Sequence, residues 1–520
     1  MRQGLCIFRL IEREAGGMME KRTGNGGTAL SQTRDQQIIH AVVEEFLALC
    51  HYPHPSWGET PLCDYMEARL KSRGWTVLRD EWGNLCAHVP AAPGRESAPV
   101  TAIQGHLDMV CAVVEGSGWD PMRDTVNAFV EDGVLRTDGV SSLGADNNLG
   151  NAAVLYLLDG DAPHGPIRLL FTVAEEIGLE GVQKMDPRWL DGVKYLINTD
   201  GFKLGRAVIS SASGVRETYR SVLAYSPCRH ECACALTLGG SLGGHSGYDI
   251  NKGRANCIKE LAAFLTRLGE RVDFDLADFT GGHALNAIPM EARAVITVPA
   301  GGEDAVNRAV EEAQCALRQA FGKADPGVRL TAERVSAPDT VWEKADRDRL
   351  LGLVEKLFNG VFAMHETLPD QVAASANVGR VWKNGAGEME INCFVRSSDE
   401  EKERIICGKN RAAAKEAGFG AAISGYPGWP GDSENPLARR MAAIYRELTG
   451  EEMEITAVHV GLEPSVLGKM NPDMDMVVTG PDIIDPHSTG ERAPVAGLGV
   501  YVRLLEKTLD ELSLVGDESR

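Results

Sequence analysis

The feature that most constrains this chain is a set of apolar runs that each end close to a His or an acidic residue. The first run spans residues 100–103 and leads to His106 and Asp108. Such a run is typical of a buried strand, and residues two apart on a strand point in the same direction. The imidazole can bind a metal, and the carboxylate can orient a ligand or a catalytic group. Alone the pair is a weak signal, because a His and an Asp near a strand end more often serve the structure.

Acidic and His residues recur at four later loop positions, always next to an expected strand or helix. They are Asp146 before a helix at 147–158, the pair Glu175 and Glu176 after a strand at 167–173, Asp200 after a strand at 193–197, and His487 after a strand at 474–478. Strands that alternate with helices predict an α/β fold with a mostly parallel central sheet flanked by helices. The carboxyl ends of parallel strands meet at one edge of a sheet, so we expect the site there.

The pattern of strands and helices changes near residue 213 and returns near residue 426. We therefore predict a catalytic domain in two segments, 34–212 and 426–520, which carries the mostly parallel sheet. The residues between them, 213–425, repeat one order of strand and helix, and we predict an inserted α+β lid domain of two similar halves. Residues 1–33 lack apolar periodicity, which predicts a disordered N-terminal extension.

Composition excludes several classes of function. The net charge of -21 argues against nucleic acid or an anionic membrane surface as the partner. No apolar run approaches the roughly 20 residues that a membrane helix needs. The 12 Cys are scattered through the chain, which is typical of reduced thiols in the cytoplasm. Three of them surround His230 and raise the alternative of a zinc site, but this segment resembles a strand more closely and no second ligand pair follows it.

Five of the residues at these loops form a donor set of two imidazoles and three carboxylates. The set comprises His106, Asp146, Glu176, Asp200 and His487, and it suits a pair of zinc, cobalt or manganese ions. If one carboxylate bridges two ions, each ion keeps one more carboxylate and one His. Two ions roughly 3.5–4 Å apart can clamp a hydroxide for attack on a carbonyl group. Glu175, directly beside Glu176, is then placed to act as the general base.

Several motifs carry a resemblance to a known family. Segments 104–110, 143–147, 175–176, 197–200 and 480–488 resemble those of the lidded di-metal peptidases, which include carnosinases, aminoacylases and glutamate carboxypeptidases. Further support comes from segments 52–56, 243–247, 285–289 and 426–429. The resemblance extends from about residue 34 to the C-terminus. Segment 488–492, which follows His487, departs from the family pattern, as do Asn148 and the pair Pro464-Ser465.

The resemblance implies a role for each position. His106 and Asp200 would hold one metal ion, Glu176 and His487 the other, and Asp146 both, with Asp108 orienting His106 and Glu175 as the general base. In the lid, His245 would donate to the tetrahedral oxyanion, Asn286 and Arg396 would hold the C-terminal end of the substrate, and Gly461 would offer backbone contacts. Arg396 suits this role because a guanidinium fork matches a carboxylate. Relatives also imply a cis peptide bond after the bridging residue, between Asp146 and Asn147.

The resemblance implies a cytoplasmic metallopeptidase that hydrolyses unblocked dipeptides, including Xaa-His types such as β-alanyl-histidine. The expected cofactors are two divalent ions, zinc first and cobalt or manganese as alternatives. The expected partner is a small peptide, with no nucleic acid and no membrane, and the chain would be a monomer or a homodimer. Rival enzymes on the same scaffold are a deacylase of N-acyl amino acids and a carboxypeptidase. A metal-binding paralogue without activity would have lost Glu175 or a ligand, and none is lost here.

Overall fold

The computed structural model describes residues 33–515 and divides the chain into two compact units. The second unit comprises Ser210–Pro430 and Ala457–Gly461, and the first unit comprises the other described residues. Residues 1–32 of the expected N-terminal extension lie outside the described part.

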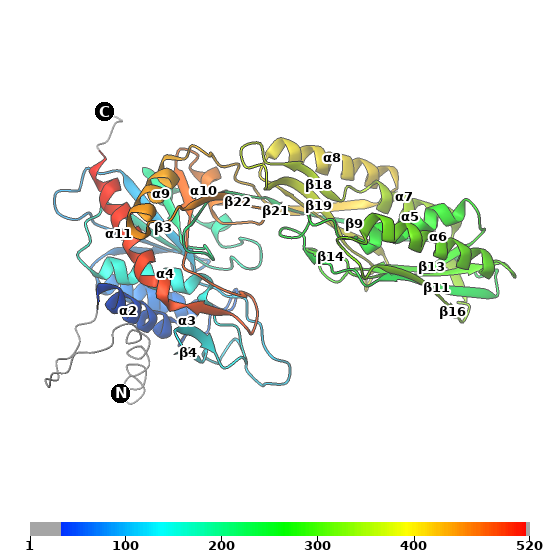
Figure 1. Ribbon diagram of the computed structural model, residues 1–520, viewed down its shortest axis with the longest axis horizontal. Helices are drawn as coiled ribbons and strands as arrows, with labels where there is room; N and C mark the ends of the chain where they lie inside the picture. The colour runs from blue at the N-terminus through cyan, green and yellow to red at the C-terminus, as the bar shows by residue number, and fades with distance from the viewer. Residues whose placement is uncertain (1–32, 516–520) are drawn as a thin grey trace, which may run out of the picture. The chain divides into compact units, whose positions relative to one another are not determined.

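A central sheet of eight strands organises the first unit (Figure 1). Its order is β1 (Thr76–Arg79), β2 (Leu85–Val89), β6 (Ile167–Thr172), β3 (Val100–His106), β7 (Val193–Asn198), β23 (Asp475–Val478), β8 (Arg206–Ser211) and β22 (Glu454–Val458). The inner strands pair in parallel, β6 with β3, β3 with β7 and β7 with β23, whereas β1, β2 and β8 pair antiparallel. The predicted α/β fold with a mainly parallel sheet is thus confirmed.

Helices cover this sheet, and the apolar core lies between the helices and the strands. They are α2 (Arg34–Leu49), α3 (Thr60–Ser72), α4 (Ala145–Asp159), α9 (Pro436–Thr449), α10 (Pro464–Met470), α11 (Leu498–Leu514) and the short η1 (Val182–Lys184), η2 (Pro187–Leu190) and η3 (Val495–Gly497). Helix α11 packs against α2, α4 and α9, so both ends of the described chain share one core. Thr33 is the N-cap of α2, where the Thr33 and Gln36 side chains cap each other's backbone N–H groups.

A small sheet of β24 (Arg492–Pro494), β5 (Val134–Thr137) and β4 (Ala128–Glu131) completes the first unit. It joins the loop after His487 to the segment before α4. None of the helices within residues 33–515 combines the length and the apolar character that crossing a membrane requires.

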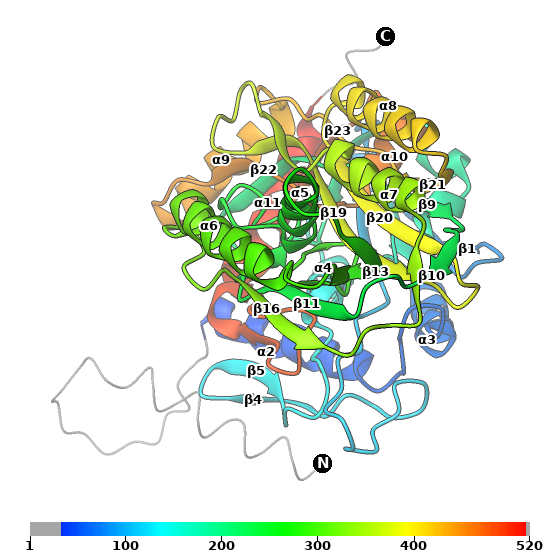
Figure 2. The ribbon, with the colours of Figure 1, turned by 90° about the vertical axis from the view of Figure 1, so that its right-hand side faces the viewer.

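The second unit is built on an antiparallel sheet. Its order is β16 (Arg329–Val335), β11 (Cys232–Gly239), β15 (Ala292–Val298), β13 (Asp275–Gly281), β19 (Val372–Lys383), β20 (Met389–Ser397), β9 (Gly214–Ser221) and β21 (Gly420–Tyr426), with β18 (Gly360–Met364) also paired to β19. Two short pairs accompany it, β10 (Tyr225–Pro227) with β17 (Thr340–Trp342) and β12 (Gly244–His245) with β14 (Ala287–Ile288). The helices α5 (Cys257–Gly269), α6 (Glu303–Phe321), α7 (Lys344–Lys356) and α8 (Glu400–Glu416) lie on one side of the sheet (Figure 2).

The sheet of the second unit has two sets of strands, β16-β11-β15-β13 and β19-β20-β9-β21, while the predicted similarity of two halves stays a prediction. Helices α5 and α6 lie against β11, β13, β15 and β16, and α8 lies against β19, β20 and β21, whereas α7 packs on α5, α8 and β13. The two sets join where β13 meets β19, with Gly281 opposite Val381. Strands β9, β13 and β19 were not predicted from the sequence, because polar or small residues interrupt their apolar pattern.

Candidate metal centre

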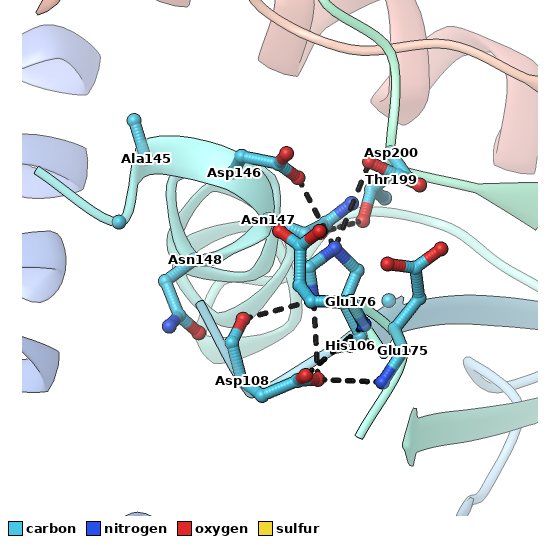
Figure 3. A network of polar contacts seen from close by, with 12 residues as sticks. His106, Asp108, Ala145, Asp146, Asn147, Asn148, Glu175, Glu176, Thr199 and Asp200 are labelled. Carbon is cyan, nitrogen blue, oxygen red and sulfur yellow. Dashed lines mark hydrogen bonds and ion pairs between the residues drawn. The ribbon is translucent and has the colours of Figure 1, made fainter. Parts of the chain in front are cut away.

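The predicted ligands lie at the carboxyl ends of the parallel strands in the first unit. Strand β3 ends at His106, and Asp200 follows the end of β7 by two residues. Asp146 lies in the first turn of α4, and Glu176 follows the end of β6. Their side chains converge from these separate elements (Figure 3). This is the edge of the sheet at which the sequence predicted a site.

Asp146 lies between the two His residues. Its Oδ1 is 3.1 Å from His106 Nε2, and its Oδ2 is 3.0 Å from His487 Nε2. The side chain of Asp146 is only 5% exposed, so solvent does not separate these groups. One carboxylate thus presents an oxygen to each imidazole, which is the arrangement that a bridging ligand needs.

The remaining carboxylates extend this arrangement on each side. Asp200 Oδ1 lies 3.7 Å from His106 Nε2, and Glu176 Oε1 lies 3.1 Å from His487 Nε2. Two groups of ligand atoms result, each within 4.8 Å: His106, Asp146 and Asp200 in one, and Asp146, Glu176 and His487 in the other. Glu175 forms a third such group with His106 and Glu176. The structure therefore brings together all five predicted ligands and the predicted base, while their individual roles stay predictions.

The carboxylate of Asp108 anchors the loop that carries both glutamates. It accepts hydrogen bonds from the backbone N–H groups of Glu175 at 2.9 Å and Glu176 at 3.2 Å, and from the Ser56 hydroxyl at 2.7 Å. Its Oδ1 also lies 3.5 Å from His106 Nδ1. Asp108 thus positions one predicted ligand and the backbone of both glutamates. Sequence reasoning did not find Ser56 as its partner.

Crowding of acidic groups sets the electrostatics of this centre. Burial and the neighbouring carboxylate of Glu176 raise the pKa of Glu175 well above its usual value. Burial and Asp146 raise the pKa of Glu176 to about 7 and that of Asp200 to about 6. Although burial opposes it, the adjacent carboxylates of Asp146 and Glu176 raise the pKa of His487 to about 11. The carboxylates of the cluster outnumber its imidazoles, so the imidazoles do not fully neutralise the negative charge.

The donor atoms fit divalent metal ions. Glu176 Oε1 and Asp200 Oδ1 are buried and accept no well-formed hydrogen bond within the described residues; each only lies near an imidazole nitrogen, that of His487 at 3.1 Å and that of His106 at 3.7 Å. A buried carboxylate oxygen with so little compensation is costly unless a cation binds it. One such oxygen belongs to each of the two groups that share Asp146, so the residues present fit two ions.

The backbone around the centre adopts uncommon conformations. Ala174, which precedes the two glutamates, has φ of 51°, and His487 has φ of 62°. Non-glycine residues rarely adopt this left-handed region, and such strain concentrates at functional sites. The peptide bond between Asp146 and Asn147 is cis, which confirms the expectation from the family pattern.

Two buried carboxylates near the centre escaped sequence reasoning because their partners are far away in the chain. Glu463 accepts hydrogen bonds from Gln104 and Thr172, and Gln104 Oε1 accepts one from Asn198 at 2.6 Å. Asn198 in turn accepts the backbone N–H of Asp200 at 2.9 Å, so this chain of hydrogen bonds ends at a predicted ligand. Glu491, the second carboxylate, binds the backbone at the start of α4.

The predicted substrate residues gather within the second unit. Strand β12 pairs with β14, so that His245 lies opposite Ala287, and Ser246 donates its backbone N–H to Asn286 O at 2.7 Å. Arg396, on β20, is buried and its Nε lies 3.4 Å from Ser246 Oγ. Gly461 packs against the Tyr426 ring so closely that a Cβ would lie 2.4 Å from it. Their roles stay predictions.

Comparisons with known proteins identify the family. A family model described as the peptidase dimerisation domain of M20 matches residues 236–325. The chain is 33% identical over 471 residues to the cytosol non-specific dipeptidase of Escherichia coli (strain K12), covering 90% of this chain and 96% of that protein. The chain belongs to the M20 peptidase family. This M20 member is therefore a metallopeptidase, and the predicted family is confirmed.

Solved structures agree with this M20 assignment. The crystal structure of aminoacylhistidine dipeptidase from Vibrio alginolyticus matches with a TM-score of 0.82 and 29% identity, covering 94% of this chain and 98% of that chain. An M20 family metallo-carboxypeptidase from Sulfolobus solfataricus matches with a TM-score of 0.51 and 13% identity, covering 91% and 99%. The second likeness shows the shared fold alone.

Proposed function

We propose that this M20 peptidase hydrolyses the peptide bond of unblocked dipeptides, with Xaa-His dipeptides such as β-alanyl-histidine among its substrates. The observation that carries the proposal is the pair of ligand groups that share Asp146, with Glu175 beside them. The names of the relatives support the substrate class, because one is a non-specific dipeptidase and another an aminoacylhistidine dipeptidase.

Two divalent ions are the proposed cofactors, zinc first and cobalt or manganese as alternatives. His106 and Asp200 would hold one ion, Glu176 and His487 the other, and Asp146 both. The short distances between the imidazole nitrogens and the carboxylate oxygens of these residues support this assignment. When bound, such ions polarise a carbonyl group and lower the pKa of bound water to about 7.

Glu175 and Asp108 have separate roles in the proposed reaction. Glu175 takes a proton from the attacking water and passes it to the leaving amine, as a general base and then a general acid. Asp108 keeps Glu175 and Glu176 in place through their backbone N–H groups.

Substrate recognition is the proposed task of the second unit. Arg396 would pair with the free carboxylate of the dipeptide together with Asn286, Gly461 would offer backbone contacts, and His245 would donate to the oxyanion. The burial of Arg396 supports this role, because a buried guanidinium attracts an anion strongly. The match to a peptidase dimerisation domain supports a homodimer rather than a monomer, and the E. coli relative supports a cytosolic location.

A comparison of free and blocked substrates tests the proposed function. We expect β-alanyl-histidine and alanyl-histidine to be cleaved and their N-acetylated forms to react at least tenfold more slowly, measured as kcat/KM. A deacylase would show the reverse order, because it needs the acyl group. A carboxypeptidase would cleave longer peptides as fast as dipeptides.

Metal removal provides a second prediction. Dialysis against a chelator should abolish dipeptide hydrolysis, because the two ligand groups hold closely spaced carboxylates without a compensating cation. Adding zinc, cobalt or manganese separately should restore activity, and elemental analysis should show two ions per chain at full activity. Full activity after complete removal of metal would contradict the proposal.

A further inference from the structure

The buried carboxylate of Glu491 binds the backbone that carries Asp146. Its Oε2 accepts the N–H groups of Leu143 and Gly144 at 2.9 Å each, and its Oε1 accepts those of Ala145 at 2.8 Å and Asp146 at 3.3 Å. The residue is only 3% exposed. One side chain therefore satisfies four consecutive backbone donors where α4 begins.

Glu491 also belongs to the loop of a second predicted ligand. It follows His487 by four residues, and its own N–H donates to Ser488 O at 3.1 Å. Asp485 and Arg492 form an ion pair across the same loop, and Arg492 begins β24. The loop of His487 and the start of α4 are thus tied together by the Glu491 carboxylate.

From this geometry we infer that Glu491 is a positioning residue, which builds the metal subsite of Asp146, Glu176 and His487 by fixing the His487 loop to the start of α4. The inference rests on the proposed function, because it assigns metal ligands to that function. The first N–H groups of a helix have no partner within the helix, and its N-terminus favours a negative charge. A carboxylate at this point therefore holds the backbone of Asp146 firmly.

The two subsites depend on Glu491 to different degrees. His106 is the last residue of β3, and Asp200 follows β7, so the central sheet holds both of them. His487 lies in a loop, and its side chain is 46% exposed. Because Asp146 belongs to both ligand groups, loss of the Glu491 carboxylate should affect both subsites, but it should weaken that of His487 much more than that of His106 and Asp200.

A titration with Co²⁺ of the metal-free protein, followed by visible absorption, tests the inference. The wild-type chain should bind two ions. In Glu491→Gln the amide group turns a donor toward two backbone N–H groups, so that only one oxygen still accepts. We expect the affinity for the ion at the subsite of Glu176 and His487 to fall by about 10- to 100-fold, and that for the ion at His106 and Asp200 to fall clearly less. Excess Co²⁺ should then restore turnover.

Glu131→Gln is a matched control. Glu131 lines the same cavity of about 310 Å³ as Glu491, but its side chain is 57% exposed and pairs with Arg136 at 2.9 Å. The same chemical change there should leave both Co²⁺ affinities unchanged. If Glu491→Gln does not fold, Glu491→Asp provides the second variant. It keeps the charge but withdraws it by one methylene group, and the same selective loss is expected.

Two results would overturn the inference. One is an unchanged affinity for both ions in Glu491→Gln. The other is an equal weakening of both ions together with a lower melting temperature of the metal-free protein, which would make Glu491 merely structural. A wild-type chain that binds two Co²⁺ ions but cleaves no dipeptide would refute the proposed function instead, and the titration would still decide the role of Glu491.

Discussion

Replacing Glu175 by Gln should lower turnover by about 10²- to 10⁴-fold while both metal ions stay bound. Gln keeps the shape of the side chain but cannot accept a proton. The backbone N–H of Glu175, which donates to Asp108, is unaffected, so the loop should keep its position. The measurement is kcat on a free dipeptide beside the metal content of the same sample.

Glu176→Gln should lose metal ions, and its turnover should fall as a result of that loss. The carboxylate of Glu176 lies 3.1 Å from His487 Nε2, in the group that shares Asp146. An amide is a weaker ligand than a carboxylate, so metal content should fall first, and excess metal should restore part of the rate.

The two adjacent glutamates can exchange roles on geometry alone, because Glu175 also lies within 4.8 Å of His106 and Glu176 ligand atoms. Loss of metal in Glu175→Gln, with full loading but no activity in Glu176→Gln, would reverse the assignment. Full activity in Glu175→Gln would remove it as the base. Glu180→Gln is the control, because Glu180 pairs with Lys184 at 3.1 Å and is partly exposed.

Replacing Arg396 by Met should lower kcat/KM on free dipeptides by roughly 10²- to 10⁴-fold. Two hydrogen bonds between charged groups contribute about 1.5–3 kcal/mol each, and Met removes both. Burial lowers the pKa of Arg396, and the side chains that act on it most after burial are Tyr426, Tyr248 and Arg216, none of them a carboxylate. A substrate carboxylate is the anion that this guanidinium would bind.

The decisive measurement compares each dipeptide with its C-terminal amide. The wild-type enzyme should prefer the free carboxylate, and Arg396→Met should lose that preference because the amide never used the guanidinium. Arg396 also stacks on Phe394 at 4.3 Å, so Arg380→Met, which removes an arginine stacked on Trp382 at 4.0 Å, is a matched control. An equal loss on both substrates would show that Arg396 only supports the structure.

The sequence predicted the sheet of the first unit well, because apolar residues predominate in its inner strands. The expected strands at 167–173 and 193–197 correspond to β6 and β7. Strand β19 of the second unit was missed. Its first half consists largely of small residues, and its burial comes from the strands and helices packed around it. The local periodicity of a sequence does not reveal which elements pack around a strand.

The sequence by itself determined which donor types are present and that each follows a strand or begins a helix, since these are local properties. Only the tertiary structure decided that the oxygens of Asp146 face two imidazoles, 40 and 341 residues away along the chain. It alone also placed Glu491 on the backbone N–H groups of residues 143–146. Contacts over such separations arise from the packing of strands and helices into one core, which no local pattern of residues specifies.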